Sequence, residues 1–277
     1  MNNTILPQFG ISLTFDVESH EIGEPRQFAE SMKPILDVLI EKEIKATFFV
    51  CGNLIRYWKD EIKLLDSHGF EIGLHGYSHQ FLKNMGEHQT KIELIRGVEE
   101  LGQILNRKPL GFRAPYFSLT ADVPWAPWAI SEAGFIYSSS VLPISNPQAG
   151  YPKAPKVPFK WSSGLIEFPA PIYGFGSLGY PVIGGGYLRV FPKVLIRAAK
   201  KNAQKTLGSW TYAHPYDFNS EEVVHITEET PWLVSRLIGV RRHLMFERIM
   251  EVVDPDARLL GDLASDELFV NSLEIWQ

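Results

Sequence analysis

The chain has 277 residues, of which 45% are hydrophobic and 21% charged, with a net charge of −5 and a pI near 5.9. This composition predicts a globular protein with a large core and gives no sign of a basic surface for nucleic acid or anionic membranes. The single cysteine, Cys51, excludes an intrachain disulfide, and no apolar run is long enough to span a bilayer. The N-terminal residues lack a basic flank and an apolar signal core, so we expect a cytoplasmic protein.

Strand-like and helix-like segments alternate along the chain. Residues 11–18 predict a strand, residues 35–44 a helix with Pro34 near its first turn, and residues 46–51 a strand of β-branched and aromatic residues. Later strands are predicted at 70–75, 110–114, 135–140, 165–169 and 210–215, and later helices at 53–67, 92–105, 124–133, 191–207 and 231–253. Such alternation is typical of an α/β fold with a parallel sheet.

The sequence predicts one domain over residues 1–277, with a C-terminal helical segment at 231–277. Residues 143–158 are rich in Pro, Lys and Gly, which indicates a long loop rather than a linker, because the strand–helix rhythm resumes after them. The glycines at 184–186 predict a flexible turn. In the long helix, apolar residues repeat at helical spacing and predict one buried face: Ile92, Ile95, Val98, Leu101 and Leu105.

The first predicted strand carries two carboxylates on one face. Asp16 and Glu18 leave the strand in the same direction, opposite to Val17. His75 and His79 are four residues apart and become neighbours if a helical turn follows the strand that ends at His75. Two imidazoles and one carboxylate form a metal site with open positions, and the second carboxylate would then accept a proton. Either carboxylate can supply the ligand, and two surface histidines are the alternative explanation.

Two further polar residues fall at the ends of predicted strands. Arg113 would stabilise the carboxylate of Asp16 if it lies beside it, although a surface arginine before a proline turn is the alternative. His214 shares one strand face with Tyr212 and could protonate a leaving group, or could pack under the turn that follows. Strand ends of this kind meet at one rim of a barrel, which favours a barrel over an open sheet.

Four short motifs follow one another within residues 11–218. They are Thr14-Phe-Asp-Val-Glu18, His75-Gly-Tyr-Ser-His79, Arg113-Ala-Pro-Tyr116 and Tyr212-Ala-His214. In this order they resemble the T-F-D-D-G, H-[ST]-x-x-H, R-x-P-Y and L-x-H motifs of the polysaccharide deacetylase family (carbohydrate esterase family four, with the chitooligosaccharide deacetylase-like fold). Gly76 stands where that family usually has Ser or Thr.

The resemblance implies a distorted (β/α) barrel and a metal-dependent hydrolase that removes an acetyl group from an N-acetylated sugar. It implies Asp16 as the general base, held by Arg113, and His214 as the general acid. The backbone N–H of Tyr116 would help to stabilise the oxyanion. The histidine pair would ligate a divalent metal, for which Zn²⁺ is the first choice.

The first departure from the family pattern concerns the metal. The family's metal-binding Asp directly follows the base, and Val17 stands at that position here. Glu18 points the same way as Asp16, so it is assigned to the metal, and His20 is an alternate ligand. A D-x-E subset of the family resembles this arrangement, including deacetylase-like proteins of exopolysaccharide assembly.

The second departure concerns the acid. The family orients its acid histidine with an Asp in a D-x-x-D-W-type motif, and no match is found between Asp122 and Asp217. Either another group orients His214, or this histidine has a different role.

We predict a deacetylase of surface polysaccharide biosynthesis that acts on an N-acetylated saccharide or on a lipid-linked or nucleotide-linked sugar precursor. Trp125, Tyr173 and Tyr187 are candidate substrate contacts, because aromatic side chains can stack on sugar rings. Two alternatives stay open. One is a metal-independent hydrolase of allantoin-like cyclic amides, suggested by Val17, and the other is a degenerate barrel that binds a glycan without turnover, suggested by the missing orienting Asp.

Overall fold

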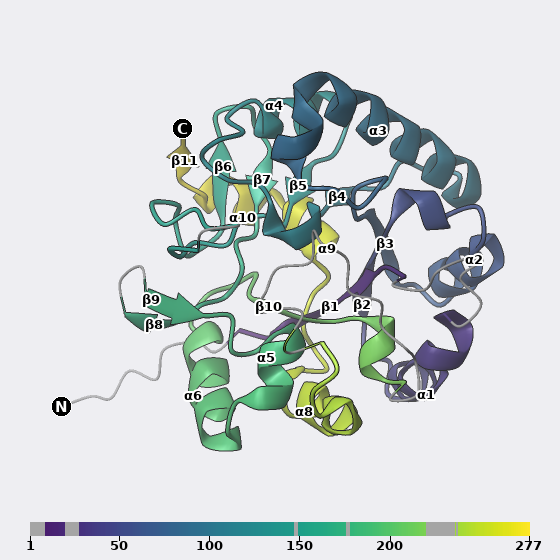
Figure 1. Cartoon of the computed structure of the whole chain (residues 1–277), viewed down its shortest axis with the longest axis vertical. Coiled ribbons are helices and arrows are strands. Elements are labelled where there is room, and N and C mark those ends of the chain that lie inside the picture. Colours follow the sequence, from purple (N-terminus) through teal and green to yellow (C-terminus); the bar gives the residue numbers. More distant parts are fainter. Residues whose placement is uncertain (1–8, 20–27, 147–148, 176–177, 220–235, 237) are drawn as a thin grey trace.

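The computed structural model describes residues 9–19, 28–146, 149–175, 178–219, 236 and 238–277. A mostly parallel sheet passes through the middle of this part of the chain, and helices surround it (Figure 1). The strands of the sheet are, in spatial order, β10 (Trp210–Ala213), β1 (Ser12–Val17), β2 (Ala46–Val50), β3 (Glu71–Leu74), β4 (Gly111–Phe112), β5 (Tyr137–Ser138), β7 (Ile166–Glu167), β6 (Phe159–Trp161) and β11 (Ile275–Trp276). The pair β6–β7 is antiparallel and the other neighbours are parallel.

Side chains of β1 alternate between two environments, as its sequence pattern predicts. Leu13, Phe15 and Val17 belong to the outer core, where the sheet packs against the helices. Thr14 and Asp16 point to the opposite side, where both contact Arg113. This alternation places the polar side chains of the strand on the inner side of the curved sheet and its apolar side chains on the outer side, against the helices.

Aromatic rings fill the inside of the curled sheet. Phe49, Tyr137 and Phe168 meet edge to face, with ring centroids 6.3 Å and 5.5 Å apart. Trp210 of β10 donates its indole N–H to the carbonyl of Phe168, just beyond β7, over 3.0 Å. This bond joins β10 to the far side of the sheet, so the α/β class and the distorted barrel expected from the sequence are confirmed.

The helices form an outer layer, which is visible as a ring around the strands in Figure 1. They are α1 (Phe28–Glu41), α2 (Lys59–Ser67), α3 (Leu82–Leu105), α4 (Ala126–Glu132), α5 (Gly185–Val190), α6 (Lys193–Ala203) and α8 (Met245–Val252). Two short helices, α9 (Leu260–Ala264) and α10 (Glu267–Ser272), lie instead against the inner rings. The N–H of Gly261 in α9 donates to the buried Glu71 at the start of β3, so α9 covers the end of the barrel where the strands begin.

The chain also contains a small hairpin and four short 3₁₀ turns among its described residues. The hairpin pairs β8 (Tyr173–Phe175) with β9 (Leu178–Tyr180) in antiparallel fashion. The turns are η1 (Gly52–Leu54), η2 (Pro115–Phe117), η3 (Pro215–Asp217) and η4 (Arg242–Leu244). Two of them, η2 and η3, begin two residues after Arg113 and one residue after His214, so the backbone bends sharply at both motifs.

Several element boundaries differ from the prediction. The helix expected at 35–44 begins at Phe28 and carries Pro34 inside it. The helix expected at 191–207 is shorter than predicted: Pro192 has an extended backbone and caps α6, which ends at Ala203. The glycines at 184–186 do not form a flexible turn, because Gly184 caps α5 and the next two residues belong to it.

The buried face of α3 also differs from the prediction. Ile92 and Ile95 are 47% and 51% exposed. The buried positions are Leu82, Thr90, Leu94, Gly97, Val98, Leu101 and Leu105. Successive residues of a helix are rotated by about 100°, so Ile95 lies beside the face that Leu94 buries and Ile92 lies far from it. Gly97 also lies on that face, and α3 packs so closely on β3 there that a Cβ on Gly97 would come within 2.5 Å of Leu74.

The predicted C-terminal helical segment is described only in part, since residues 231–235 and 237 lie outside the described residues. In the described part, residues 238–241 form a turn, and α8, α9 and α10 are helical. The segment ends in β11, which pairs with β6 and is the last strand at that edge of the sheet. Among the described residues, none of the helices combines the length and the apolar character that crossing a membrane requires.

Candidate active site and metal centre

Glu18, His75 and His79 meet just beyond the ends of β1 and β3. One ligand atom from each lies within 4.8 Å of the other two. Oε2 of Glu18 is 3.7 Å from Nε2 of His75 and is in direct contact with Nε2 of His79. The Glu18 and His75 side chains are only 9% and 3% exposed, so the cluster is largely withdrawn from solvent. Val17 lies in the outer core and faces away from this cluster.

Backbone groups hold His75 in one orientation. Its N–H donates to the carbonyl of Val50 in β2, which extends the pairing of β3. Its ring Nδ1 lies 3.0 Å from the carbonyl oxygen of Arg113. A carbonyl only accepts hydrogen bonds, so Nδ1 carries the proton and the lone pair is on Nε2, the atom that faces Glu18. Metal ligation needs this tautomer.

A bend, rather than the expected helical turn, connects the two histidines, whose ring centroids are 5.2 Å apart. Gly76 has φ of +62°, and a Cβ on it would come within 2.8 Å of Pro115. These constraints give a physical reason for glycine at a position where the family usually has Ser or Thr. His79 also has a positive φ, of 57°, which costs a non-glycine residue on the order of 1–3 kcal/mol. Strain of this kind is often retained at functional sites.

The three donors fit one divalent ion. Two neutral imidazoles and a carboxylate are a ligand set of hydrolytic zinc sites, which leave a position for water or substrate. Nε2 of His79 is buried and has no hydrogen-bond partner, although it touches a carboxylate oxygen of Glu18. A buried nitrogen lone pair and a carboxylate repel each other unless a cation or a proton lies between them. The donor set therefore has the composition and the unsatisfied atom expected of a metal site.

Asp16 lies on the same face of β1 as Glu18 and forms a buried ion pair with Arg113. Nη1 of Arg113 is 2.6 Å from Oδ1 of Asp16 and donates to Thr14 Oγ1 over 2.9 Å. Nη2 donates to Ser139 Oγ over 2.8 Å, and the arginine is 0% exposed. The alternative of a surface arginine is therefore excluded. The ion pair fixes the Asp16 carboxylate two residues before Glu18, which remains available to the histidines.

Tyr116 forms part of the wall of the cluster. Its ring stacks on Phe81 at 4.4 Å and meets the ring of His79 edge to face at 4.8 Å. Tyr116 and Phe117 have φ of 58° and 54°, so two successive non-glycine residues adopt the left-handed conformation beside the site. The sequence predicted a role for the backbone N–H of Tyr116, which stays a prediction, and it did not identify the packing role of the ring.

A buried polar network supports the turn that carries Tyr116. The N–H of Ala114 donates to Ser140 Oγ over 2.8 Å, and the N–H of Ser140 donates to Glu167 over 2.7 Å. Glu167 also accepts the N–H of Val141 and is 0% exposed. Burial raises the pKa of Glu167 despite these hydrogen bonds. The sequence analysis did not identify this network, because its members come from three separate strands.

His214 reaches the same cluster from β10, with Nε2 3.8 Å from Oε1 of Glu18. The sequence analysis found no residue to orient it, and the structure supplies Asp217. Oδ2 of Asp217 accepts the backbone N–H of His214 over 2.9 Å and lies 3.1 Å from its ring Nδ1. A carboxylate accepts, so Nδ1 carries the proton and Nε2 faces the site.

Charges around His214 favour its protonated form. Burial alone would lower the pKa of His214, but the hydrogen bond and charge of Asp217 outweigh burial and raise it. Burial would raise the pKa of Asp217, but Arg189 and His214 outweigh burial and lower it. The pair is therefore an ionised carboxylate beside an imidazole that readily holds a proton, which suits a proton donor.

The candidate sugar contacts lie in mixed surroundings. Trp125 and Tyr173 are half-buried and pack against the outer core. Tyr187 of α5 is half-buried, and its ring centroid is 6.0 Å from that of Tyr180 and 6.1 Å from that of Phe191. Their part in substrate binding stays a prediction.

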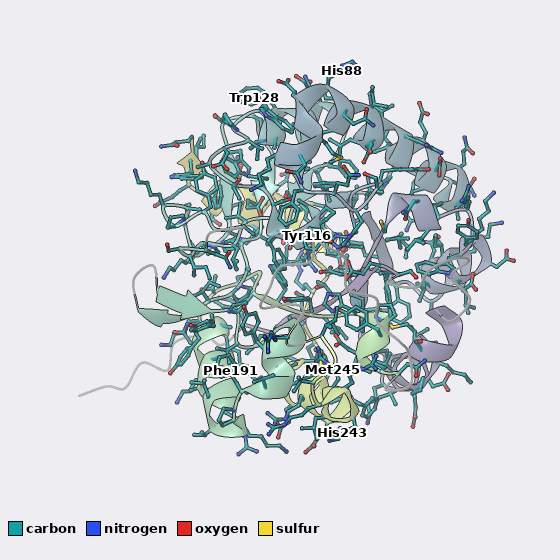
Figure 2. The ribbon with its side chains drawn as sticks, viewed as in Figure 1. His88, Tyr116, Trp128, Phe191, His243 and Met245 are labelled. Carbon is teal, nitrogen blue, oxygen red and sulfur yellow. The ribbon has the colours of Figure 1, made fainter. Side chains whose placement is uncertain are left out.

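The other histidines do not form a second cluster in the part of the chain that the structure describes. His88 and His243 are exposed and lie at the periphery of the molecule, whereas Tyr116 lies near the centre of the view (Figure 2). His20, the alternate ligand, and His225 lie outside the described residues. Among the described residues, Glu18, His75 and His79 are therefore the one cluster of possible metal ligands.

Comparison with known sequences divides the chain into two parts. A family profile described as polysaccharide deacetylase matches residues 5–135, and one described as a domain of unknown function (DUF3473) matches residues 139–257. A peptidoglycan-N-acetylglucosamine deacetylase of Bacillus cereus is 30% identical over 117 residues, which are 42% of this chain and 40% of the relative. A peptidoglycan deacetylase of Helicobacter pylori is 28% identical over 100 residues, or 36% of this chain and 31% of the relative. The chain thus spans less than half the length of these relatives.

Comparison with solved structures supports the fold over the whole chain. A crystal structure of a Mycobacterium smegmatis protein assigned to the polysaccharide deacetylases superposes with a TM-score of 0.60 and 22% identity, covering 100% of this chain and 96% of that one. The profile match includes the motifs at Asp16, His75 and Arg113, whose side chains converge in the site. Residues 5–135, a little under half of the chain, are thus similar to the polysaccharide deacetylase family.

Proposed function

We propose that this protein is a metal-dependent N-deacetylase that hydrolyses the acetamide of an N-acetylated sugar in a surface glycan. The observation that carries the proposal is the convergence of Glu18, His75 and His79 within 4.8 Å, beside an arginine-bound Asp16. A cluster of this composition suits amide hydrolysis, since it offers a metal site and a separate carboxylate base. The names of the related peptidoglycan deacetylases support the same substrate class.

The residues divide the reaction between them. A divalent ion bound by Glu18, His75 and His79 would polarise the amide carbonyl and make water easier to deprotonate. Asp16 accepts a proton from the attacking water, and Arg113 holds it in place. The Tyr116 N–H donates to the oxyanion that forms at the carbonyl.

The leaving group is an amine, which departs only if it receives a proton. His214 faces the same cluster with Nε2 and holds its ring with Nδ1 on Asp217, so it supplies this proton when the C–N bond breaks. The products are acetate and the free amino sugar. The raised pKa of His214 favours the protonated form that this step consumes.

The two alternatives make different demands on these residues. The cyclic-amide hydrolase was suggested by Val17, but Val17 faces the helices while Glu18 lies with the histidines. The non-catalytic barrel was suggested by the missing Asp that would orient His214, and Asp217 contacts the ring Nδ1 of His214. Both observations favour the deacetylase.

The finer points of the proposal come from the sequence. They are a D-x-E subset, Zn²⁺ as the ion, a cytoplasmic role in exopolysaccharide assembly on a lipid-linked or nucleotide-linked precursor, and sugar contacts at Trp125, Tyr173 and Tyr187. We also propose one catalytic domain over residues 1–277, which includes both matched parts, and the pairing of β10 with β1 supports it.

Acetate release from acetylated chito-oligosaccharides and from peptidoglycan fragments tests the proposal. We expect release that a chelator abolishes and added Zn²⁺ restores, and loss of both metal and release in Glu18→Gln. Lys33→Gln, which removes an exposed ion pair with Asp37, is the matched control and should behave as wild type. Activity that persists through strong chelation would exclude a metal-dependent mechanism.

A further inference from the structure

Helix α5 lies directly against the strand that carries His214, and its glycines make this approach possible. A Cβ on Gly184 would come within 2.3 Å of the Tyr212 ring, and one on Gly185 within 2.8 Å of it. Gly185 also has φ of +50°, which favours glycine. Any side chain at either position would push α5 away from β10. The close contact brings Arg189, five residues after Gly184, beneath the turn η3.

Arg189 is 1% exposed and connects two segments that are distant in sequence. Its Nη2 is 3.2 Å from Oδ1 of Asp217. Its Nη1 donates to the carbonyls of Ile238 and Val240, each over 3.0 Å. Backbone carbonyls therefore fix the guanidinium on one side, and the Asp217 carboxylate receives it on the other.

The two oxygens of Asp217 have separate tasks. Oδ2 receives the backbone N–H and the ring Nδ1–H of His214, and Oδ1 faces Arg189. Asp217 is 0% exposed, so without a cation its charge would lie in a medium that strongly disfavours it. If the carboxyl were protonated on Oδ2 or rotated away, it would no longer accept both His214 hydrogens.

We propose that Arg189 is a positioning residue of the reaction, which acts through Asp217 to hold the His214 ring with Nε2 towards the scissile amide. This inference rests on the proposed deacetylase function and goes beyond it. Arg189, Asp217 and His214 all belong to residues 139–257, the part matched as a domain of unknown function. That part would then complete the active site by supplying the acid and its support, whereas residues 5–135 supply the metal ligands and the base.

Kinetics on Zn²⁺-loaded protein with an acetylated chito-oligosaccharide test the inference. We expect Arg189→Met to lower kcat by roughly 10- to 100-fold with KM changed by no more than about threefold, the range seen when a supporting residue is lost. Arg189→Lys keeps the charge and should recover part of the loss. Zn²⁺ content should stay at the wild-type value, because the side-chain contacts of Arg189 described above are with Asp217 and two backbone carbonyls.

A double-mutant comparison identifies the route of the effect. If Arg189 acts only through Asp217, then Arg189→Met added to Asp217→Asn should lower kcat by less than about twofold further. Arg248→Met is the matched control, since Arg248 is also buried, at 7% exposed, and donates to a backbone carbonyl, that of Phe191, away from the site. It should keep kcat. Wild-type kcat in Arg189→Met, fully additive losses in the double variant, or an equal loss in Arg248→Met would each overturn the inference.

A proton NMR measurement keeps the inference separate from the deacetylase assignment. The Nδ1–H of His214, identified by its absence in His214→Gln, should give a downfield signal in Zn²⁺-loaded wild type and in Arg248→Met. That signal should be lost or shifted in Arg189→Met. An unchanged signal would contradict the positioning role, whereas absence of acetate release in wild type would contradict only the proposed function.

Discussion

The buried pair of Arg113 and Asp16 gives the sharpest stability prediction. Arg113 is 0% exposed, pairs with Asp16 at 2.6 Å, and lies 4.2 Å and 4.1 Å from the ring centroids of Phe49 and Trp210. In Arg113→Met the apolar contacts are partly kept, but the Asp16 carboxylate is left buried without its cation. Breaking a buried pair in this way costs about 3–5 kcal/mol. At about 2–4 °C per kcal/mol for a chain of this size class, Tm should fall by roughly 6–20 °C.

Removal of the second charge should recover much of this loss. Asp16→Asn in the Arg113→Met background eliminates the unpaired carboxylate, so we expect the double variant to be more stable than Arg113→Met by about 2 kcal/mol. Urea unfolding followed by tryptophan fluorescence measures all the variants. Arg107→Met is the control, because its pair with Asp66 is 53% exposed on the arginine side and should contribute only about 0–1 kcal/mol. If Arg113→Met costs no more than Arg107→Met, or the double variant recovers nothing, the reasoning is refuted.

Three further predictions concern the site and the base of the barrel. Gly76→Ser should lower the free energy of unfolding by about 1–3 kcal/mol, since φ is +62° and Pro115 lies within 2.8 Å of a Cβ; an unchanged urea midpoint would contradict this. His214→Gln should keep the bound metal but lower acetate release by about 10²- to 10⁴-fold, measured by metal analysis and acetate assay; loss of the metal would contradict the division of roles. Burial raises the pKa of Glu71 above its ordinary value of 4.5, so the folded state retains the proton more strongly and stability falls as pH rises from about 4.5 through the folded pKa. Glu71→Gln should flatten that fall in urea titrations at several pH values, and an unchanged slope would contradict the assignment.

Local alternation was enough to predict which side chains of the first strand share a face. Glu18 was assigned to the metal because it points with Asp16, and the structure places it with His75 and His79. The side of His214 followed from the same argument, since its ring contacts that of Tyr212. Such inferences succeed because side-chain direction in a strand depends only on position.

Asp217 was not predicted, because it follows His214 by three residues and does not stand in the motif with which the family orients its acid histidine. The signal was local: an acid three residues after His214, across a proline, is the pattern of a capped turn. Arg189 has no comparable signal, because it reaches Asp217 through the packing of α5 on β10. The buried face of α3 was misjudged for the same reason, since Leu74 in β3 decides which residues of α3 are covered. Long-range packing of this kind cannot be deduced from spacing within one element.

An anomalous-difference map from crystals grown with Zn²⁺ tests the central claim most directly. The account predicts one strong peak within coordination distance of Glu18 Oε2, His75 Nε2 and His79 Nε2, about 2.0–2.2 Å from each. It also predicts that the Asp16 carboxylate, held by Arg113, stays outside that distance. A map without density between the three donors, or with the ion bound by Asp16 in place of Glu18, would contradict the account.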